Sequence, residues 1–368
     1  MTRVLVVDDS AVVRQTLLAL LSETGGFQVD VAANPFVALR HLADHRPDVI
    51  VLDLEMPKMD GLTFLRKIMA EDPIPVVVCS AHAGRAALDA LEAGAVDVIT
   101  KPSFGVRGFL EEQVVSIADI LRGAAKARLP GRRATASTGE QAAGERWPMT
   151  TRPPIVALGA STGGTQALRT VLGSLKPEAP ALLIVQHMPP GFPRAFAERL
   201  DQESALKVRE AQDGDRVEAG HALVAPGDMH LRLREDLRGY FAEVTAGPLV
   251  SRHRPSVDVL FRSVADLAGP QAVGVLLTGM GDDGAEGLLA MRRAGASTVA
   301  QDEATSVVFG MPKEAIRRGA TEYVLPLPAI SEAIRCLATG KSPGRPQPAE
   351  PPEESTRRAA PAGSALRH

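Results

Sequence analysis

Three residues that could act together in hydrolysis each follow a short apolar run: Ser161, His187 and Asp283. Ser161 lies in Gly159-Ala160-Ser161-Thr162-Gly163, which fits the G-x-S-x-G pattern of a sharp strand-to-helix turn. A serine hydroxyl is a poor nucleophile until a base removes its proton. His187 could be that base if Asp283 accepts a hydrogen bond from its other ring nitrogen. The residue types therefore predict acyl transfer through a tetrahedral oxyanion.

Other interpretations of these three residues stay open. Ser161 and Asp283 could be helix caps, and His187 could lie in a turn before two prolines. His253, in Ser251-Arg252-His253-Arg254-Pro255, is the main alternative for the base. We favour His187 because it ends the strand that follows the one before Ser161. The order Ser, His, Asp along the chain differs from that of α/β-hydrolases, so it predicts a different fold.

The run Gly279-Met280-Gly281-Asp282-Asp283-Gly284 also matches the glycine pattern of dinucleotide-binding sites. It follows an apolar run, opens a helix-like segment and precedes Asp302 by about 20 residues, as that fingerprint requires. However, Asp282 and Asp283 would stand where the pyrophosphate binds, which would bring like charges together. The sequence therefore disfavours nucleotide binding.

A second reactive set consists of Asp8, Asp9, Asp53, Ser80 and Lys101, which end four apolar runs. Three carboxylates that converge repel one another, and a hard divalent cation such as Mg²⁺ relieves that repulsion. Such a metal can hold a phosphoryl group against a carboxylate nucleophile. Lys101 would supply a positive charge for the phosphate, and Ser80 a hydroxyl hydrogen bond. The first two aspartates alone could cap a helix, but the ordered set favours a phosphoryl site.

Alternating strand-like and helix-like segments must position both sets. The strand-like runs of the first third lie near residues 3–7, 28–32, 48–53, 75–79 and 96–100, and the amphipathic stretches span 11–23, 35–44, 62–70, 83–93 and 107–121. Five such units predict a parallel sheet with helices on both faces. Because chemistry gathers beyond the carboxyl ends of such strands, the residues that end the runs should meet there.

The alternation divides the chain into two α/β units. Residues 1–122 form the first, and residues 123–152, which hold many Ala, Arg, Gly, Thr and Pro, read as a flexible linker. Residues 153–340 form a three-layer α/β unit with a small antiparallel β insertion, and residues 341–368 read as a disordered tail. Four short runs make up the predicted insertion: Lys207–Glu210, His221–Ala225, His230–Leu233 and Tyr240–Val244.

The bulk composition excludes several classes of protein. The 368 residues are 45% apolar and 23% charged, with a net charge of −3 and only 4% aromatics, which argues against a nucleic-acid platform. No apolar stretch approaches the ~18–20 residues that span a bilayer, so no direct membrane insertion is expected. The N-terminus has no signal-peptide pattern, and Cys79 and Cys336 are the only cysteines. These features predict a cytoplasmic protein.

Residues 1–122 resemble a response-regulator receiver domain. The motifs that carry the resemblance are Val-Val-Asp8-Asp9-Ser, Leu-Asp53-Leu-Glu-Met-Pro-Lys-Met-Asp-Gly, Ser80-Ala and Lys101-Pro102. The resemblance implies a flavodoxin-like, doubly wound fold in which Asp53 is the phosphoacceptor. It implies that Asp9 and Asp53 ligate Mg²⁺ with the Glu55 carbonyl while Asp8 assists, and that Ser80 and Lys101 are the switch residues.

Residues 153–340 resemble the catalytic domain of chemotaxis protein-glutamate methylesterases. The motifs are Gly-Ala-Ser161-Thr-Gly-Gly-Thr, Val-Gln-His187-Met-Pro-Pro-Gly-Phe, Arg-His-Arg-Pro-Ser-Val-Asp-Val-Leu-Phe and Leu-Leu-Thr-Gly-Met280-Gly-Asp-Asp283-Gly. The resemblance implies that Ser161, His187 and Asp283 form a catalytic triad. It implies that the backbone N–H groups of Thr162 and Met280 donate to the oxyanion.

Together the two resemblances predict a phosphorylation-activated hydrolase in chemotactic adaptation. It would demethylate glutamate γ-methyl esters on methyl-accepting chemotaxis receptors, release methanol and deamidate receptor glutamines. A chemotaxis histidine kinase would be the phosphodonor, with Mg²⁺ in the receiver domain and no cofactor at the esterase site. The alternative is a receiver-controlled non-enzymatic output protein, a scaffold or a transcriptional regulator. Residues 155–339 are too long and too βα-like for a compact DNA-binding output.

Overall fold

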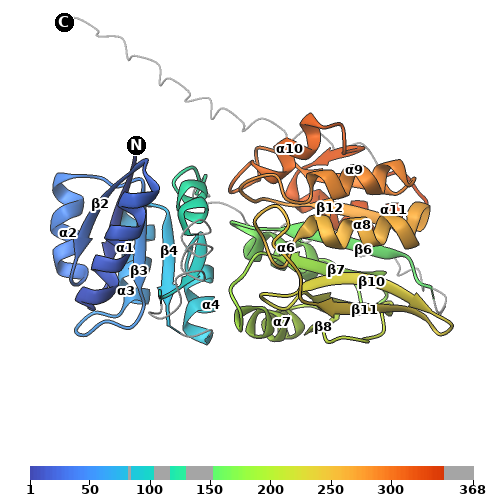
Figure 1. Cartoon of the computed structure of the whole chain (residues 1–368), viewed down its shortest axis with the longest axis horizontal. Helices are drawn as coiled ribbons and strands as arrows, with labels where there is room; N and C mark the ends of the chain where they lie inside the picture. Colours follow the sequence, from blue (N-terminus) through green and yellow to red (C-terminus); the bar gives the residue numbers. More distant parts are fainter. Residues whose placement is uncertain (82–83, 103–116, 130–151, 344–368) are drawn as a thin grey trace, which may run out of the picture.

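The structure is a computed structural model that describes residues 1–81, 84–102, 117–129 and 152–343. These residues form two α/β units side by side (Figure 1), and we call residues 1–129 the N-terminal unit and residues 152–343 the C-terminal unit. Most of the predicted linker and tail, and the first part of the predicted helix at 107–121, lie outside the described residues. Among the described helices, none combines the length and apolar character needed to cross a bilayer.

A five-stranded parallel sheet with the order β2-β1-β3-β4-β5 forms the centre of the N-terminal unit. This order confirms the predicted doubly wound arrangement. The strands span Thr2–Val7 (β1), Phe27–Ala32 (β2), Val49–Asp53 (β3), Val76–Ser80 (β4) and Asp97–Thr100 (β5). The helices span Ala11–Thr24 (α1), Pro35–Asp44 (α2), Gly61–Glu71 (α3) and Arg85–Glu92 (α4), and residues 117–124 are also helical.

Side-chain caps set the starts of three helices in this unit. Ser10, Asn34 and Asp60 each accept a hydrogen bond from the backbone N–H three residues later, at 3.4, 3.0 and 2.8 Å. A cap of this kind typically stabilises a helix by ~1 kcal/mol. The caps therefore fix where the loops after β1, β2 and β3 become helices, and two of these loops carry Asp9 and Glu55.

A seven-stranded parallel sheet with the order β14-β13-β12-β6-β7-β9-β8 forms the C-terminal unit. Its central strands are buried throughout, as expected for a parallel sheet covered on both faces. The strands of this sheet span Ile155–Ala160 (β6), Ala181–Gln186 (β7), Lys207–Glu210 (β8), His221–Val224 (β9), Ala272–Leu276 (β12), Ser297–Gln301 (β13) and Tyr323–Leu325 (β14). The helices span Gly164–Gly173 (α6), Phe192–Glu203 (α7), Val257–Leu267 (α8), Ala285–Arg293 (α9), Met311–Arg317 (α10) and Leu327–Ala338 (α11), with a short 3₁₀ turn at Gly269–Gln271.

The antiparallel insertion is smaller than the sequence predicts. His230–Asp236 (β10) and Gly239–Thr245 (β11) do form an antiparallel pair. However, β8 and β9 join the edge of the main sheet as parallel strands, so the prediction that they are antiparallel is wrong. The loop of residues 211–220 returns the chain to the start of β9, as parallel pairing requires, whereas a tight turn would give a hairpin.

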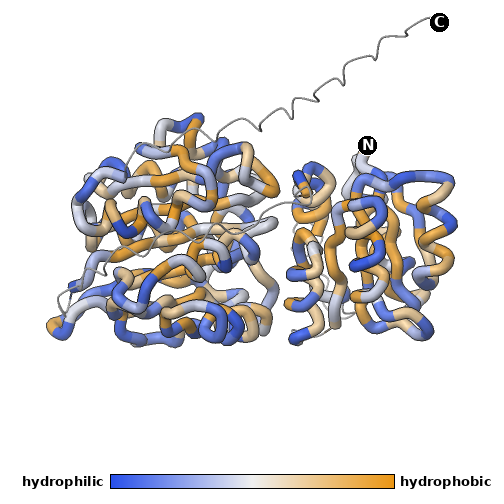
Figure 2. The backbone as a smooth tube through the Cα atoms, turned by 180° about the vertical axis from the view of Figure 1, so that it is seen from behind, coloured by the Kyte–Doolittle hydropathy of each residue, from blue (hydrophilic) through white to orange (hydrophobic). Residues whose placement is uncertain are grey.

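Apolar residues line the strands of both units, as Figure 2 shows in orange. In the N-terminal unit one buried cluster includes Leu17, Val51, Leu121 and Ala124, so the helical segment 117–124 packs as part of that core. Val307 of the C-terminal unit packs against the same cluster. The two units therefore share an apolar contact.

Polar contacts also join the two units. Arg199 of α7 places Nη1 2.8 Å from Oδ1 of Asp89 in α4. The backbone N–H of Gly163 donates a hydrogen bond to the carbonyl of Val96 at 3.2 Å. Because Gly163 lies between β6 and α6, the N-terminal unit contacts the C-terminal unit at the turn that carries the predicted nucleophile.

Candidate active site

The turn between β6 and α6 presents Ser161. Gly163 in this turn has a left-handed φ of 77°, and a Cβ there would approach Val307 to 2.5 Å, so the position requires glycine. The backbone N–H of Ser161 donates to the carbonyl of Thr278 at 3.0 Å, which ties the turn to the loop after the neighbouring strand β12. The sharp turn expected from the G-x-S-x-G pattern is present.

His187 follows the strand next to the one that leads to Ser161. In the register of β6 and β7, Ala160 pairs with Gln186, so Ser161 and His187 follow paired positions of adjacent parallel strands. The backbone N–H of His187 donates to the Ala160 carbonyl at 3.2 Å, so the hydrogen-bond ladder of the two strands continues to His187. The sheet therefore brings the predicted nucleophile and base to one edge.

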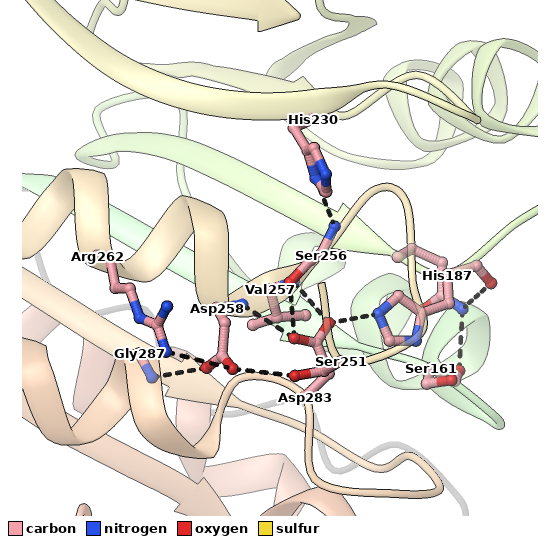
Figure 3. Close-up of polar contacts among 11 residues, drawn as sticks. Ser161, His187, His230, Ser251, Ser256, Val257, Asp258, Arg262, Asp283 and Gly287 are labelled. Carbon is pink, nitrogen blue, oxygen red and sulfur yellow. Dashed lines mark hydrogen bonds and ion pairs between the residues drawn. The ribbon is translucent and has the colours of Figure 1, made fainter. Parts of the chain in front are cut away.

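Asp283 and His187 form a direct hydrogen bond, with Nε2 of His187 2.8 Å from Oδ2 of Asp283. In Figure 3 the side chains of Ser161 and Asp283 lie on opposite sides of the His187 ring. The other ring nitrogen, Nδ1, is buried and has no hydrogen-bond partner among the residues that the structure describes. That nitrogen is therefore free to accept a proton.

The N-terminus of α8 anchors Asp283. Its carboxylate accepts hydrogen bonds from Ser256 Oγ at 2.7 Å and from the N–H groups of Val257 and Asp258 at 2.7 and 3.1 Å (Figure 3). Burial by itself raises the pKa of Asp283, but the hydrogen bond and charge of His187, with the Ser256 hydroxyl, lower it below its ordinary value. A helix N-terminus also favours a negative charge. Ser256 is not among the residues predicted from the sequence, although a serine just before an amphipathic stretch is a recognisable cap signal.

The neighbouring carboxylate, Asp282, has a different partner. Its Oδ2 lies 2.9 Å from Nη2 of Arg318, whereas Asp283 faces His187. Asp302, the acidic residue of the nucleotide-binding interpretation, accepts hydrogen bonds from the N–H and hydroxyl of Thr305 at 2.9 and 2.6 Å in a local turn. These contacts give no support to the nucleotide-binding interpretation. The glycine run is the loop that carries Asp283.

His253, the alternative base, stacks on His187. The two ring centroids are 3.8 Å apart, and the planes differ by 12°. Burial lowers the pKa of His253 to about 3; repulsion from His187 and Arg252 adds to this, and attraction from Asp283 opposes it. His253 is therefore neutral at physiological pH and supports the ring of His187, whereas His187 holds the contact with Asp283.

The backbone N–H groups of Thr162 and Met280 were predicted to stabilise the oxyanion. Within the described ranges, neither N–H donates a hydrogen bond. Gly279, which precedes Met280, lies so close to the nucleophile turn that a Cβ on it would be 2.8 Å from Cβ of Ser161. The two N–H groups thus come from loops that meet at Ser161, and both lack a protein acceptor, as oxyanion donors should.

A cavity of about 220 Å³ lies beside Ser161 and His187, between the two units. The C-terminal unit lines it mainly with Met188, Pro189, Pro190, Leu249, Arg252, His253 and Pro255. The N-terminal unit lines it with Asp97, Ile99, Thr100, Ile117 and Ile120. The N-terminal unit thus forms one wall of the candidate active site.

Asp97 is a buried carboxyl in this wall. Burial raises the pKa of Asp97 to about 6, against the hydrogen bond from the Val98 N–H at 2.8 Å. The Thr162 hydroxyl lies near this carboxyl, but it is buried and makes no hydrogen bond of ordinary geometry. Within the described residues, Asp97 therefore has no cationic side chain that forms an ion pair with it.

The second predicted set also converges. Carboxylate oxygens of Asp8, Asp9 and Asp53 all lie within 4.8 Å of one another, at the ends of the adjacent strands β1 and β3. Lys101 Nζ lies 2.6 Å from Asp53 Oδ2 and 3.2 Å from Asp8 Oδ2. Ser80 ends β4 in the next position of the sheet. The structure thus places all five residues at one edge.

The acidic cluster has the donors that a hard cation prefers. Oδ2 of Asp8 is buried and has Lys101 Nζ at 3.2 Å as its ion-pair partner among the described residues, and Asp53 accepts a hydrogen bond from the Glu55 N–H at 3.1 Å. Burial raises the pKa of Asp53; Lys101 and the Glu55 N–H oppose this, and Asp8 adds to it. An oxygen-only cluster with excess negative charge fits a divalent cation such as Mg²⁺.

Comparison with known proteins identifies the family of each unit. Residues 156–334 match the CheB methylesterase family, and residues 4–107 match the response regulator receiver domain.

The chain is 54% identical over 347 residues to protein-glutamate methylesterase/protein-glutamine glutaminase 1 of Anaeromyxobacter dehalogenans, covering 91% of this chain and 99% of that protein. It is 51% identical over 348 residues to protein-glutamate methylesterase/protein-glutamine glutaminase 3 of Geobacter metallireducens, covering 90% and 98%. A solved catalytic domain of the CheB methylesterase from Thermotoga maritima is 40% identical and covers 49% of this chain and 96% of that chain, with a TM-score of 0.48. The chain therefore belongs to the family of CheB methylesterases that carry a response regulator receiver domain.

Proposed function

We propose that this chain is a protein-glutamate methylesterase and protein-glutamine glutaminase in which Ser161 is the nucleophile, His187 the base and Asp283 the residue that orients the base. The relatives' names describe this pair of activities. One observation supports the residue roles most strongly. The 2.8 Å bond between His187 Nε2 and Asp283 leaves Nδ1 as the nitrogen that can act as the base, and His187 and Ser161 line the same cavity. A non-enzymatic output is disfavoured because the matched output family is a methylesterase.

The proposed reaction is acyl transfer in two halves. Ser161 Oγ attacks the carbonyl carbon of a glutamate γ-methyl ester while its proton passes to Nδ1 of His187. The N–H groups of Thr162 and Met280 stabilise the oxyanion. The imidazolium returns the proton to the leaving methoxide, so methanol departs. Water then attacks the acyl-serine, its proton passes through His187 to Ser161, and the glutamate carboxylate is released. With a glutamine substrate, ammonia leaves in place of methanol.

Replacement of the nucleophile tests this proposal. Ser161→Ala should lower methanol release from a methyl-esterified receptor fragment by about 10³-fold or more, because loss of a triad nucleophile leaves only the background of binding and oxyanion stabilisation. Ser174→Ala, which removes an exposed hydroxyl just after α6, is the matched control and should retain the wild-type rate. Circular dichroism checks that both variants fold. Release by Ser161→Ala at more than a tenth of the wild-type rate would refute the assignment.

We further propose that Asp53 is the phosphoacceptor of the receiver domain. Asp8, Asp9 and Asp53 and the Glu55 carbonyl would hold Mg²⁺, which when bound supplies positive charge to the phosphoryl oxygens and carboxylates. Lys101 already lies 2.6 Å from Asp53 and can pair with the phosphoryl group, and Ser80 can donate to it. The 4.8 Å carboxylate cluster supports this assignment.

Phosphorylation would then open the catalytic cavity. The receiver side chains that line it stand in the path of a bulky protein substrate. A shift of the population toward an open arrangement would expose Ser161. We propose methyl-accepting chemotaxis receptors as substrates, a chemotaxis histidine kinase as phosphodonor and the cytoplasm as the location.

A further inference from the structure

The loop that carries His253 holds two non-glycine residues in a left-handed conformation. Ser251 has φ 50° and Arg252 has φ 67°, and Val250 and His253 exchange backbone hydrogen bonds at 3.1 and 2.9 Å. These values describe a two-residue turn with positive φ at both central positions, where Asn or Gly is usual. A side chain is strained in this conformation. Arginine at such a position indicates a role for the side chain itself.

Arg252 and its near neighbour Arg254 have different partners. Arg254 bonds within the C-terminal unit, to Asp228 Oδ1 through Nη2 and Nε at 2.6 and 2.8 Å. Arg252 forms its ion pair across the interface, with Nη1 2.8 Å from Oδ2 of Asp119 in the receiver helix 117–124. Within the described part of the chain, no carboxylate of its own unit pairs with Arg252. When the receiver withdraws, this cation is left beside the catalytic histidines without that partner.

The receiver helix presents more than a carboxylate to the catalytic unit. Ile117 and Ile120, three positions apart and hence on one face of the helix, line the cavity beside Ser161. Asp119 lies between them in sequence and reaches Arg252. One helical turn thus lines the cavity with apolar side chains and places an acidic group on the arginine. The catalytic surface accepts a helix of this character.

We infer that Arg252 determines substrate specificity by binding a carboxylate on an α-helical substrate segment whose apolar side chains occupy the cavity beside Ser161. The inference rests on the proposed methylesterase activity and names how that site recognises its protein substrate. In this structure, Asp119 and the receiver helix stand in the place of the substrate helix. The same arginine therefore binds the receiver when the site is closed and the substrate when it is open.

The test compares two substrates with one enzyme. The full-length chain is assayed for methanol release from a methyl-esterified helical receptor fragment and from N-acetylglutamate γ-methyl ester, which lacks both helix and flanking acid. The quantity of interest is the ratio of the two kcat/KM values, measured with acetyl phosphate and Mg²⁺ so that the receiver is open in every variant. Arg252→Gln should lower this ratio by about threefold to fivefold, the range expected for a partly exposed ion pair. Arg252→Lys should restore most of it.

Two control variants separate recognition from closure. Asp119→Asn removes the same ion pair from the receiver side without altering Arg252, so with the receiver open it should leave the ratio unchanged. Arg128→Gln removes another ion pair between the units, the one to Glu303 at 2.7 Å, and it should also leave the ratio unchanged.

Ionic strength gives a further readout. Salt should lower the wild-type ratio but not that of Arg252→Gln, because exposed ion pairs are screened. If the ratio of kcat/KM values is the same for wild type and Arg252→Gln and does not change with salt, the inference is overturned. Arg252 would then serve only to bind Asp119 of the receiver. No methanol release by the wild type from either substrate would instead refute the proposed function.

Discussion

The receiver site and the esterase site both lie beyond the carboxyl ends of parallel strands. The pKa of a buried aspartate is nevertheless shifted in opposite directions in the two sites. Burial raises the pKa of Asp53, and Lys101 offsets this only in part. Burial also acts to raise the pKa of Asp283, but His187 and Ser256 outweigh it and the pKa falls. The receiver site is thus short of positive charge until a cation binds, whereas the esterase site is electrostatically complete before its substrate arrives.

Loss of the orienting carboxylate should have the largest effect of the predictions that test this contrast. Asp283→Asn keeps the shape of the side chain but removes the charge that fixes the His187 tautomer. We expect kcat for methanol release to fall by about 10³–10⁴-fold with little change in KM. Asp282→Asn is the matched control, because Asp282 pairs with Arg318 at the rim and not with His187. A comparable loss in both variants would contradict the proposed division of roles.

Much of both sites can be predicted from the sequence, because residues that follow parallel strands meet at one edge of the sheet. Asp8, Asp53, Ser161 and His187 each follow or end an apolar run, and parallel strands carry them to a common edge. The alternation alone predicts a parallel sheet in each unit, and the structure confirms it. Patterns that lie within one strand and its next turn are local, so they are visible without the fold.

The rest depends on contacts between segments far apart in the chain. The hydrogen bond from Ser256 to Asp283 joins residues on different elements, and the stacking of His253 on His187 does the same. The ion pair between Asp119 and Arg252 requires knowledge of how the units pack. The direction of the edge strands β8 and β9 was predicted wrongly. A short alternating run indicates a strand but does not show whether the neighbouring strand is parallel or antiparallel.

Phosphorylation should have the second largest effect. If the receiver site lacks positive charge, a small-molecule phosphodonor such as acetyl phosphate should act only with Mg²⁺, and it should raise the rate on a receptor fragment by about tenfold through a population shift. Asp53→Asn should keep the basal rate and lose the stimulation. A fragment of residues 152–343 serves as the open reference. Equal rates for this fragment and the unphosphorylated full chain would argue against occlusion by the receiver.

A third aspartate, Asp97, lies between the two sites and sharpens the comparison, although its predicted effect is the smallest. Burial raises its pKa to about 6 from the ordinary 3.8, because no cation pairs with it among the described residues. The folded chain therefore holds this proton more tightly than the unfolded chain. Its contribution to stability is fully present below pH 3.8 and is lost as pH rises to about 6.

Asp97→Asn removes that ionisation and keeps an acceptor for the Val98 N–H. We expect the free energy of unfolding at pH 7 to increase by about 2 kcal/mol relative to wild type, and the gain to vanish below pH 4, in denaturant titrations across this range. Asp60→Asn is the control, because Thr63 lowers the pKa of that exposed helix cap and asparagine caps equally well. If the gain in unfolding free energy at pH 7 persists at pH 4, the substitution stabilises the chain through packing and not through loss of the charge. A gain that follows pH would show that the fold buries Asp97 in the cavity wall at an electrostatic cost.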